Sequence, residues 1–132
     1  MPDPVVITRP RAQAASLARA VAALGRTPVL LPLLEIAPLA DQAPLAQALA
    51  GLADYALVAF VSPNAIDAAF AHIRAWPPGV TLAVLGEGSR AALARHGISA
   101  ANANIVSPVD TSRSDSENLL QSLDLAALAA AD

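Results

Sequence analysis

The sequence contains no cysteine and no lysine, only two histidines and very few aromatic residues. Without cysteine the chain cannot form a disulfide, a zinc–thiolate site or a thiol nucleophile, and a reducing compartment is compatible with it. Without lysine it cannot form a Schiff base with a carbonyl substrate. Two histidines are too few to suggest a metal cluster. These absences exclude much covalent chemistry, and we predict no metal site.

The net charge and the apolar runs argue against nucleic acids and membranes as partners. A formal net charge of −3 argues against a nucleic-acid partner, because binding to a phosphate backbone needs a basic face. The first residues, "MPDPVVITRP", lack the basic head and apolar core of a signal peptide. The most apolar run, "VLLPLLEIAPLA", is interrupted by Pro32, Glu35 and Pro38, whereas a membrane helix needs about 20 apolar residues. We therefore predict no membrane contact and a cytoplasmic location.

The first part of the chain reads as a strand, a helix and an extended segment. "PVVIT" is a short β-branched run typical of a buried strand. Leu17, Val21 and Leu24 then recur at helical spacing, and Gly25 is placed to end that helix. "TPVLLPLLEI" follows as an extended segment, whose prolines keep it out of the centre of a sheet.

The remainder of the chain alternates between strand-like apolar runs and segments whose apolar residues recur at helical spacing. Strands are predicted at "ALVAFV", which is continuously apolar and so should be covered on both faces, at "TLAVLG" and at "ANIVS". Helical repeats separate them at 45–52, 66–73 and 89–97. Ser114 and Glu117 have the spacing of a capping box, which would open a last helix. Such alternation predicts an α/β fold with parallel strands and right-handed crossovers. The sheet looks unfinished, because a doubly wound domain usually has five or six strands.

Three strand-to-helix junctions, "ITRP", "VSPNA" and "LGEGS", are the candidate binding site. In a parallel sheet such turns share the edge where the strands end, and each opens a helix whose first amides lack partners and favour anions. Ser62 in the second junction is equally explained as an ordinary helix cap. Position 91 is alanine, so "GEGS" lacks the third glycine of a dinucleotide fingerprint. No acid–base pair or catalytic triad is visible, and the catalytic residues are unknown.

Five segments carry a resemblance to a known family. "VVITRPRAQAASLARAVAALG", "PLLEIAPL", "FVSPNAI", "LAVLGEGSRAAL" and "SDSENLL" occur in this order, and over Val5 to Leu120 the chain resembles uroporphyrinogen-III synthase. The resemblance implies a cyclising lyase of haem and sirohaem biosynthesis without a metal or cofactor. Its substrate would be the linear tetrapyrrole hydroxymethylbilane, closed to uroporphyrinogen III with inversion of the last pyrrole ring. Holding the substrate folded would supply most of the catalysis, through proximity and orientation.

The resemblance also implies an architecture and a site. It predicts two flavodoxin-like doubly wound α/β domains joined by a two-stranded ladder, monomeric at full length, with substrate between them. Residues 1–34 would form the opening β-α unit of the first, discontinuous domain and the start of the crossover, and 35–132 most of the second domain, incomplete at its C-terminal end. At about half the family's usual length the chain is expected to be a fragment, inactive alone, with residues 4–25 lacking sheet neighbours. The residues expected to bind the carboxylate arms are Thr8, Arg9, Ser62, Asn64, Gly86, Gly88 and Ser89.

Two other functions are compatible with the same residues. One is a truncated, non-catalytic remnant that binds a tetrapyrrole weakly or not at all. The other is a doubly wound domain that binds a nucleotide or flavin phosphate, for which the fold alone argues by analogy. The isomer of uroporphyrin formed from hydroxymethylbilane separates the first from an enzyme, and a copurified flavin or nucleotide would indicate the second.

Overall fold

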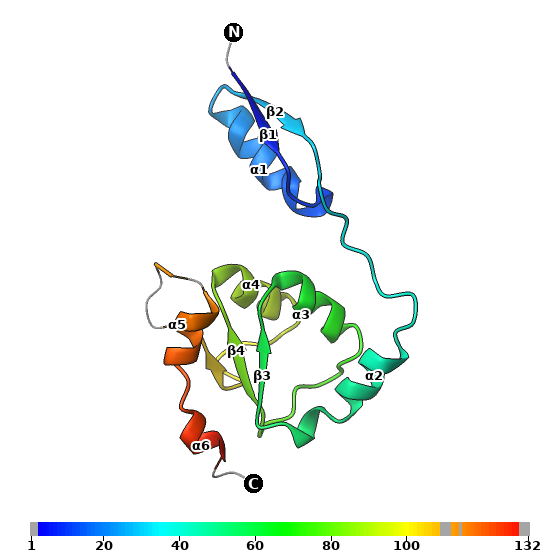
Figure 1. The fold of residues 1–132 in the computed structure, drawn as a ribbon, viewed down its shortest axis with the longest axis vertical. Helices are drawn as coiled ribbons and strands as arrows, with labels where there is room; N and C mark the ends of the chain where they lie inside the picture. Colours follow the sequence, from blue (N-terminus) through cyan, green and yellow to red (C-terminus); the bar gives the residue numbers. More distant parts are fainter. Residues whose placement is uncertain (1–2, 109–111, 114, 130–132) are drawn as a thin grey trace. The chain divides into compact units, whose positions relative to one another are not determined.

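The computed structural model describes residues 3–108, 112–113 and 115–129, and the chain divides into two compact units. Unit 1 is Met1–Leu39 and unit 2 is Ala40–Asp132. Each unit has its own parallel strands interleaved with helices (Figure 1), so the predicted α/β class with a flavodoxin-like arrangement is confirmed. Within the described part of the chain, every helix is too short or too polar to cross a membrane.

Unit 1 is a single β-α-β unit. Strand β1 (Pro4–Ile7) pairs in parallel with β2 (Thr27–Leu30), and helix α1 (Arg11–Ala23) connects them. The prediction that residues 4–25 lack a sheet neighbour was therefore wrong, because the extended segment supplies a partner strand. Pro28 is tolerated there because both strands of a two-stranded sheet are edges, where a missing N–H costs little. Gly25 has φ 78° and follows the last turn of α1, as predicted.

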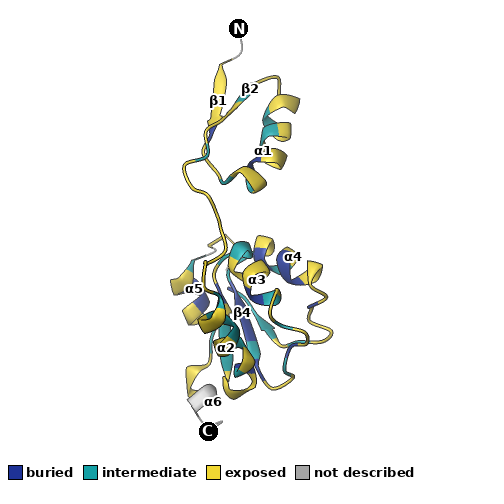
Figure 2. Cartoon of the chain, turned by 90° about the vertical axis from the view of Figure 1, so that its right-hand side faces the viewer, coloured by how far each residue is buried: buried dark blue, intermediate teal, exposed yellow. Residues whose placement is uncertain are grey.

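Burial in unit 1 is slight. Among its described residues, 3–39, the buried hydrophobic ones are Ile7 and Ala14, whereas Val5 and Val6 of the same strand as Ile7 are exposed. The prediction of a buried first strand was thus wrong in that respect, because one helix can cover only one face of a two-stranded sheet. Figure 2 shows the contrast with unit 2, where the buried residues gather.

Unit 2 is built on a three-stranded parallel sheet in the order β3-β4-β5. The predicted strands are confirmed, as β3 (Leu57–Phe60), β4 (Thr81–Val84) and the short β5 (Ile105–Val106). Phe60 pairs with Val84, and Ala83 pairs with Val106, so the strands end together. The other elements are α2 (Ala43–Ala50), the 3-10 turn η1 (Leu52–Asp54), α3 (Pro63–Phe70), α4 (Glu87–Arg95), α5 (Ser116–Gln121) and α6 (Leu125–Ala129).

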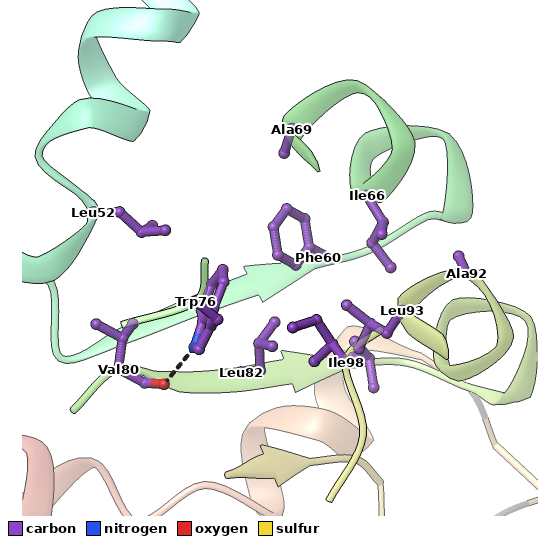
Figure 3. Packing of buried hydrophobic residues seen from close by; sticks show 11 residues of the cluster. Leu52, Phe60, Ile66, Ala69, Trp76, Val80, Leu82, Ala92, Leu93 and Ile98 are labelled. Atoms are coloured by element: carbon purple, nitrogen blue, oxygen red, sulfur yellow. Dashed lines mark hydrogen bonds between the residues drawn. The ribbon is translucent and has the colours of Figure 1, made fainter. Parts of the chain in front are cut away.

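The core of unit 2 lies between the sheet and helices α3 and α4. Ile66, Leu82 and Leu93, one from each of these three elements, are fully buried and belong to one cluster. Figure 3 shows these side chains converging, with the Trp76 ring beside them. The Trp76 Nε1–H donates a 2.8 Å hydrogen bond to the Val80 carbonyl, so the polar atom of this large ring is satisfied inside the core.

The opposite face of the sheet is covered unevenly. Ala83 of the central strand is fully buried although it lies outside the main cluster, and Figure 2 shows α5 across β4 from α3 and α4. Ala59 of β3 is exposed, and Val61 just beyond this strand is 60% exposed. The prediction that both faces of this strand are covered was therefore wrong. A continuous apolar run shows that a segment is suited to burial, but not whether a neighbour covers it.

Two helix starts differ from those predicted. Helix α4 begins at Glu87, earlier than the predicted start at Ser89, because Gly86 is its N-cap. For α5 the predicted cap, Ser114, lies outside the described residues. The N-cap is Asp115, whose Oδ1 accepts the Asn118 N–H at 2.7 Å, so Glu117 does not stand at the capping-box position.

Candidate functional site

The candidate site in unit 2 is the edge where β3, β4 and β5 end, together with the turns that follow; we call it the carboxyl edge. It consists of the residues from Val61 to Asn64, from Leu85 to Arg90, and Ser107. Because the strands are parallel and in register, these turns emerge side by side although they are far apart in sequence. This is the edge at which open parallel sheets bind their ligands.

Ser62 opens α3 as the sequence predicts. Its backbone is extended, with φ −155° and ψ 151°, and its Oγ accepts the Ala65 N–H at 3.1 Å, while Pro63 stands in the first turn. Asn64, the next residue, is half-buried. The cap accounts for Ser62 without a ligand. Its hydroxyl proton nevertheless remains able to donate to an anion at the edge.

The start of α4 has no side-chain cap. Gly86 occupies the N-cap position, and the first intrahelical bond runs from the Arg90 N–H to the Gly86 carbonyl at 3.1 Å. The amides of Glu87, Gly88 and Ser89 consequently have no acceptor within the helix. Three N–H groups at a positive helix end form a natural receptor for a carboxylate.

The two helix starts lie within van der Waals reach of each other. A Cβ placed on Gly88 would be 3.6 Å from Cγ of Pro63, which is an ordinary contact. Gly88 is exposed, whereas Ser89 in the same turn is only 5% exposed and faces the interior. The structure thus gathers five of the seven predicted site residues at one edge, which are Ser62, Asn64, Gly86, Gly88 and Ser89.

Thr8 and Arg9 belong to the other unit. They follow β1 directly and are both exposed, and the Thr8 carbonyl accepts the Leu33 N–H at 3.2 Å. Pro10, which cannot provide a side-chain cap, is the N-cap of α1. This junction therefore resembles the start of α4 in lacking a side-chain cap, and the exposed guanidinium of Arg9 lies next to it in the chain.

Sequence reasoning missed Arg90. Its Nη2 donates a 2.6 Å hydrogen bond to Oγ of Ser107, which follows β5, so this arginine lies on the carboxyl edge. The two residues are 17 positions apart, and their contact depends on the pairing of β4 with β5. An arginine in the first turn after a glycine-rich junction is the one signal that could have suggested it.

The two histidines lie elsewhere. His96 is the C-cap of α4, and its Nε2 is 2.8 Å from Oδ1 of Asp67 in α3. His72 follows α3, and its Nε2 is 2.8 Å from Oε1 of Gln42. His72 thus contacts the N-cap residue of α2 and His96 contacts the surface of α3, and neither contact involves the starts of α3 and α4 at the carboxyl edge. They act as local links between elements of unit 2.

A family model described as "Uroporphyrinogen-III synthase HemD" matches residues 15–130, which is most of the chain. The chain belongs to this family. The resemblance seen in the sequence is thereby confirmed, and with it the assignment to porphyrin biosynthesis. No curated protein matches the chain.

Membership in the uroporphyrinogen-III synthase family gives the carboxyl edge a chemical context. The family implies a cyclising lyase and a tetrapyrrole substrate. The matched stretch contains all five candidates of unit 2, and it begins after Thr8 and Arg9. A tetrapyrrole with acetate and propionate arms presents many carboxylates, the type of ligand that uncapped helix starts favour.

Proposed function

We propose that the carboxyl edge of unit 2 binds the carboxylate arms of hydroxymethylbilane, for its closure to uroporphyrinogen III with inversion of the last pyrrole ring. The observation that supports this most strongly is the uncapped start of α4 beside the capped start of α3. The free amides of the first turn of α4 donate to one carboxylate. The Ser62 hydroxyl and the Asn64 amide donate to a second group of the same arm or its neighbour.

The distribution of charge supports a role for Thr8 and Arg9 as well. Residues 1–39 carry four arginines and two acidic residues, which gives a net charge of +2, whereas residues 40–132 carry four arginines and nine acidic residues, which gives −5. A polyanionic substrate is therefore not attracted by unit 2 as a whole, and binding there depends on local donors. Unit 1 attracts it overall, and the Arg9 guanidinium can bind a carboxylate with two parallel hydrogen bonds.

We infer further that the chain follows the two-domain layout of its family. Residues 1–34 would belong to the first domain and the start of the crossover, and residues 35–132 to the second. The separate parallel sheets of the two units support this assignment. Catalysis in this scheme comes from holding the bilane in a folded conformation, so that its ends meet, rather than from an acid–base pair.

Among the described residues of unit 1, Ile7 and Ala14 are the buried hydrophobic ones. A core of this size is too small to keep a substrate-binding surface rigid. We therefore expect the 132-residue chain to bind tetrapyrrole but not to invert the last ring by itself. A cytoplasmic location remains the prediction made from the sequence.

The proposal is tested by two measurements on the purified chain. Incubation with hydroxymethylbilane, followed by oxidation and chromatography of the uroporphyrin isomers, should give isomer I at the spontaneous level. Isomer III above that background would refute the expected inactivity. Equilibrium dialysis with uroporphyrin III should show saturable binding, and its absence would refute the proposed function. Dialysis with flavin mononucleotide serves as the comparison, since tighter binding of that ligand favours a flavin-phosphate site.

A further inference from the structure

The arginines of unit 2 occupy different environments. Arg95, in the last turn of α4, pairs with Asp67 at 3.4 Å, and Arg113 pairs with Asp115 at 3.3 Å. Arg74 is exposed on the connection from α3 to β4, which returns to the opposite edge of the sheet. Arg90 differs from these three, because it combines a place on the carboxyl edge with the absence of a carboxylate partner among the described residues.

The Arg90 side chain is held in place by a neutral group. It is half-buried, and the Ser107 hydroxyl accepts from its Nη2 at 2.6 Å. A hydroxyl orients the guanidinium but does not neutralise it, so the full positive charge and the remaining N–H donors are left for another ligand. Fixing a long side chain in advance lowers the entropy that binding would otherwise cost.

We propose that Arg90 binds a carboxylate arm of the tetrapyrrole, with Ser107 as the residue that positions it. This inference rests on the proposed function, since it names a further binding residue at the same edge. A planar guanidinium and a carboxylate form two parallel charge-assisted hydrogen bonds, which are stronger than those of neutral amides. Arg90 thus supplies the positive charge that the predicted residues of unit 2 lack, because Ser62, Asn64, Gly86, Gly88 and Ser89 are all neutral.

The alternative is that Arg90 only joins α4 to the end of β5. In that case Arg90→Gln would lower the stability of unit 2 without changing its affinity for an anion. The affinity of a folded Arg90→Gln variant therefore separates the two explanations. Glu87 tests whether an anion binds at this edge at all. It is exposed, lies three positions before Arg90 on the same helix, and places a negative charge at the edge that would oppose an anionic ligand.

The experiment is equilibrium dialysis of the 132-residue chain with uroporphyrin III, whose side arms are all carboxylates. Arg90→Gln should weaken binding about tenfold, the loss of one charge-assisted interaction, and Arg90→Lys should weaken it less because the charge remains. Glu87→Gln should strengthen binding about twofold. Arg74→Gln removes the same charge from the opposite edge and should change the affinity by less than about twofold.

Ser107→Ala should weaken binding less than Arg90→Gln, and Ser107→Thr, which keeps the hydroxyl, should restore it. The Trp76 emission of each variant shows whether unit 2 is folded, because this ring lies in its core. If the unaltered chain binds no uroporphyrin III, the proposed function itself fails. If the unaltered chain binds and a folded Arg90→Gln variant binds equally well, the role of Arg90 is overturned. Should Arg90→Gln not fold, unchanged affinity in a folded Arg90→Lys variant would overturn it instead, because lysine keeps the charge but cannot form the two parallel hydrogen bonds.

Discussion

Replacement of Leu82 by alanine tests whether unit 2 is organised around the cluster between its sheet and helices α3 and α4. Leu82 lies in the central strand and is 0% exposed. The substitution removes three carbon atoms from the core, about 0.8 kcal/mol for each. It also leaves a cavity, and the whole loss in such sites is about 3–5 kcal/mol of the free energy of unfolding.

Urea denaturation followed by the emission of Trp76 measures this loss. Trp76 is the single tryptophan of the chain, and it is packed in the same cluster, so its signal reports unit 2. With a urea dependence of about 1 kcal/mol per molar, the midpoint should fall by roughly 3 M, or the variant should be unfolded without urea. Leu120→Ala is the matched control, because that leucine of α5 is 55% exposed and should cost about 1 kcal/mol or less. Equal effects of the two substitutions would contradict the described core.

Two further predictions concern the helix starts and the first unit. Ser62→Ala should destabilise unit 2 by about 1 kcal/mol, because α3 loses its cap. Ser62→Asp can still accept the Ala65 N–H and should lower the stability less. An equal loss in the two variants, measured by urea denaturation, would argue against the cap. In hydrogen exchange, the amides of β1 should exchange faster than those of β4. In the part of unit 1 that the structure describes, the buried hydrophobic residues are Ile7 and Ala14, whereas β4 lies in the core of unit 2. Equal protection of the two strands would show that unit 1 is stabilised to the same extent.

Local signals in the sequence predicted most elements because each depends on a few neighbouring residues. The positive φ of Gly25 and the hydrogen bond that Ser62 accepts both follow from the residue type at a helix end. The gathering of the second and third junctions follows from strand–helix alternation, which makes parallel strands end at one edge. These features need no knowledge of distant contacts.

The features that were missed depend on residues remote in sequence or on competition between neighbours. The pairing of Pro28 opposite Val5 required knowing that this sheet has two strands and hence no centre. The contact of Arg90 with Ser107 follows only once β5 is placed beside β4. At α5 the N-cap is Asp115, whose carboxylate accepts the Asn118 N–H; serine and aspartate are both good caps, so the residue type alone does not decide which one opens the helix.

The order of the strands in unit 2 has a consequence for how this unit acquires its structure. Each strand of the β3-β4-β5 sheet pairs with the next one along the chain, so each pairing spans one helix and its connections and no more. The chain entropy lost in closing a pairing grows with the sequence separation of the paired residues, and pairing with the next strand keeps that separation as short as a parallel crossover allows. During synthesis the β3-α3-β4 portion has both of its strands available before β5 leaves the ribosome. The sheet can therefore grow in the direction of translation, strand by strand, without waiting for a distant segment.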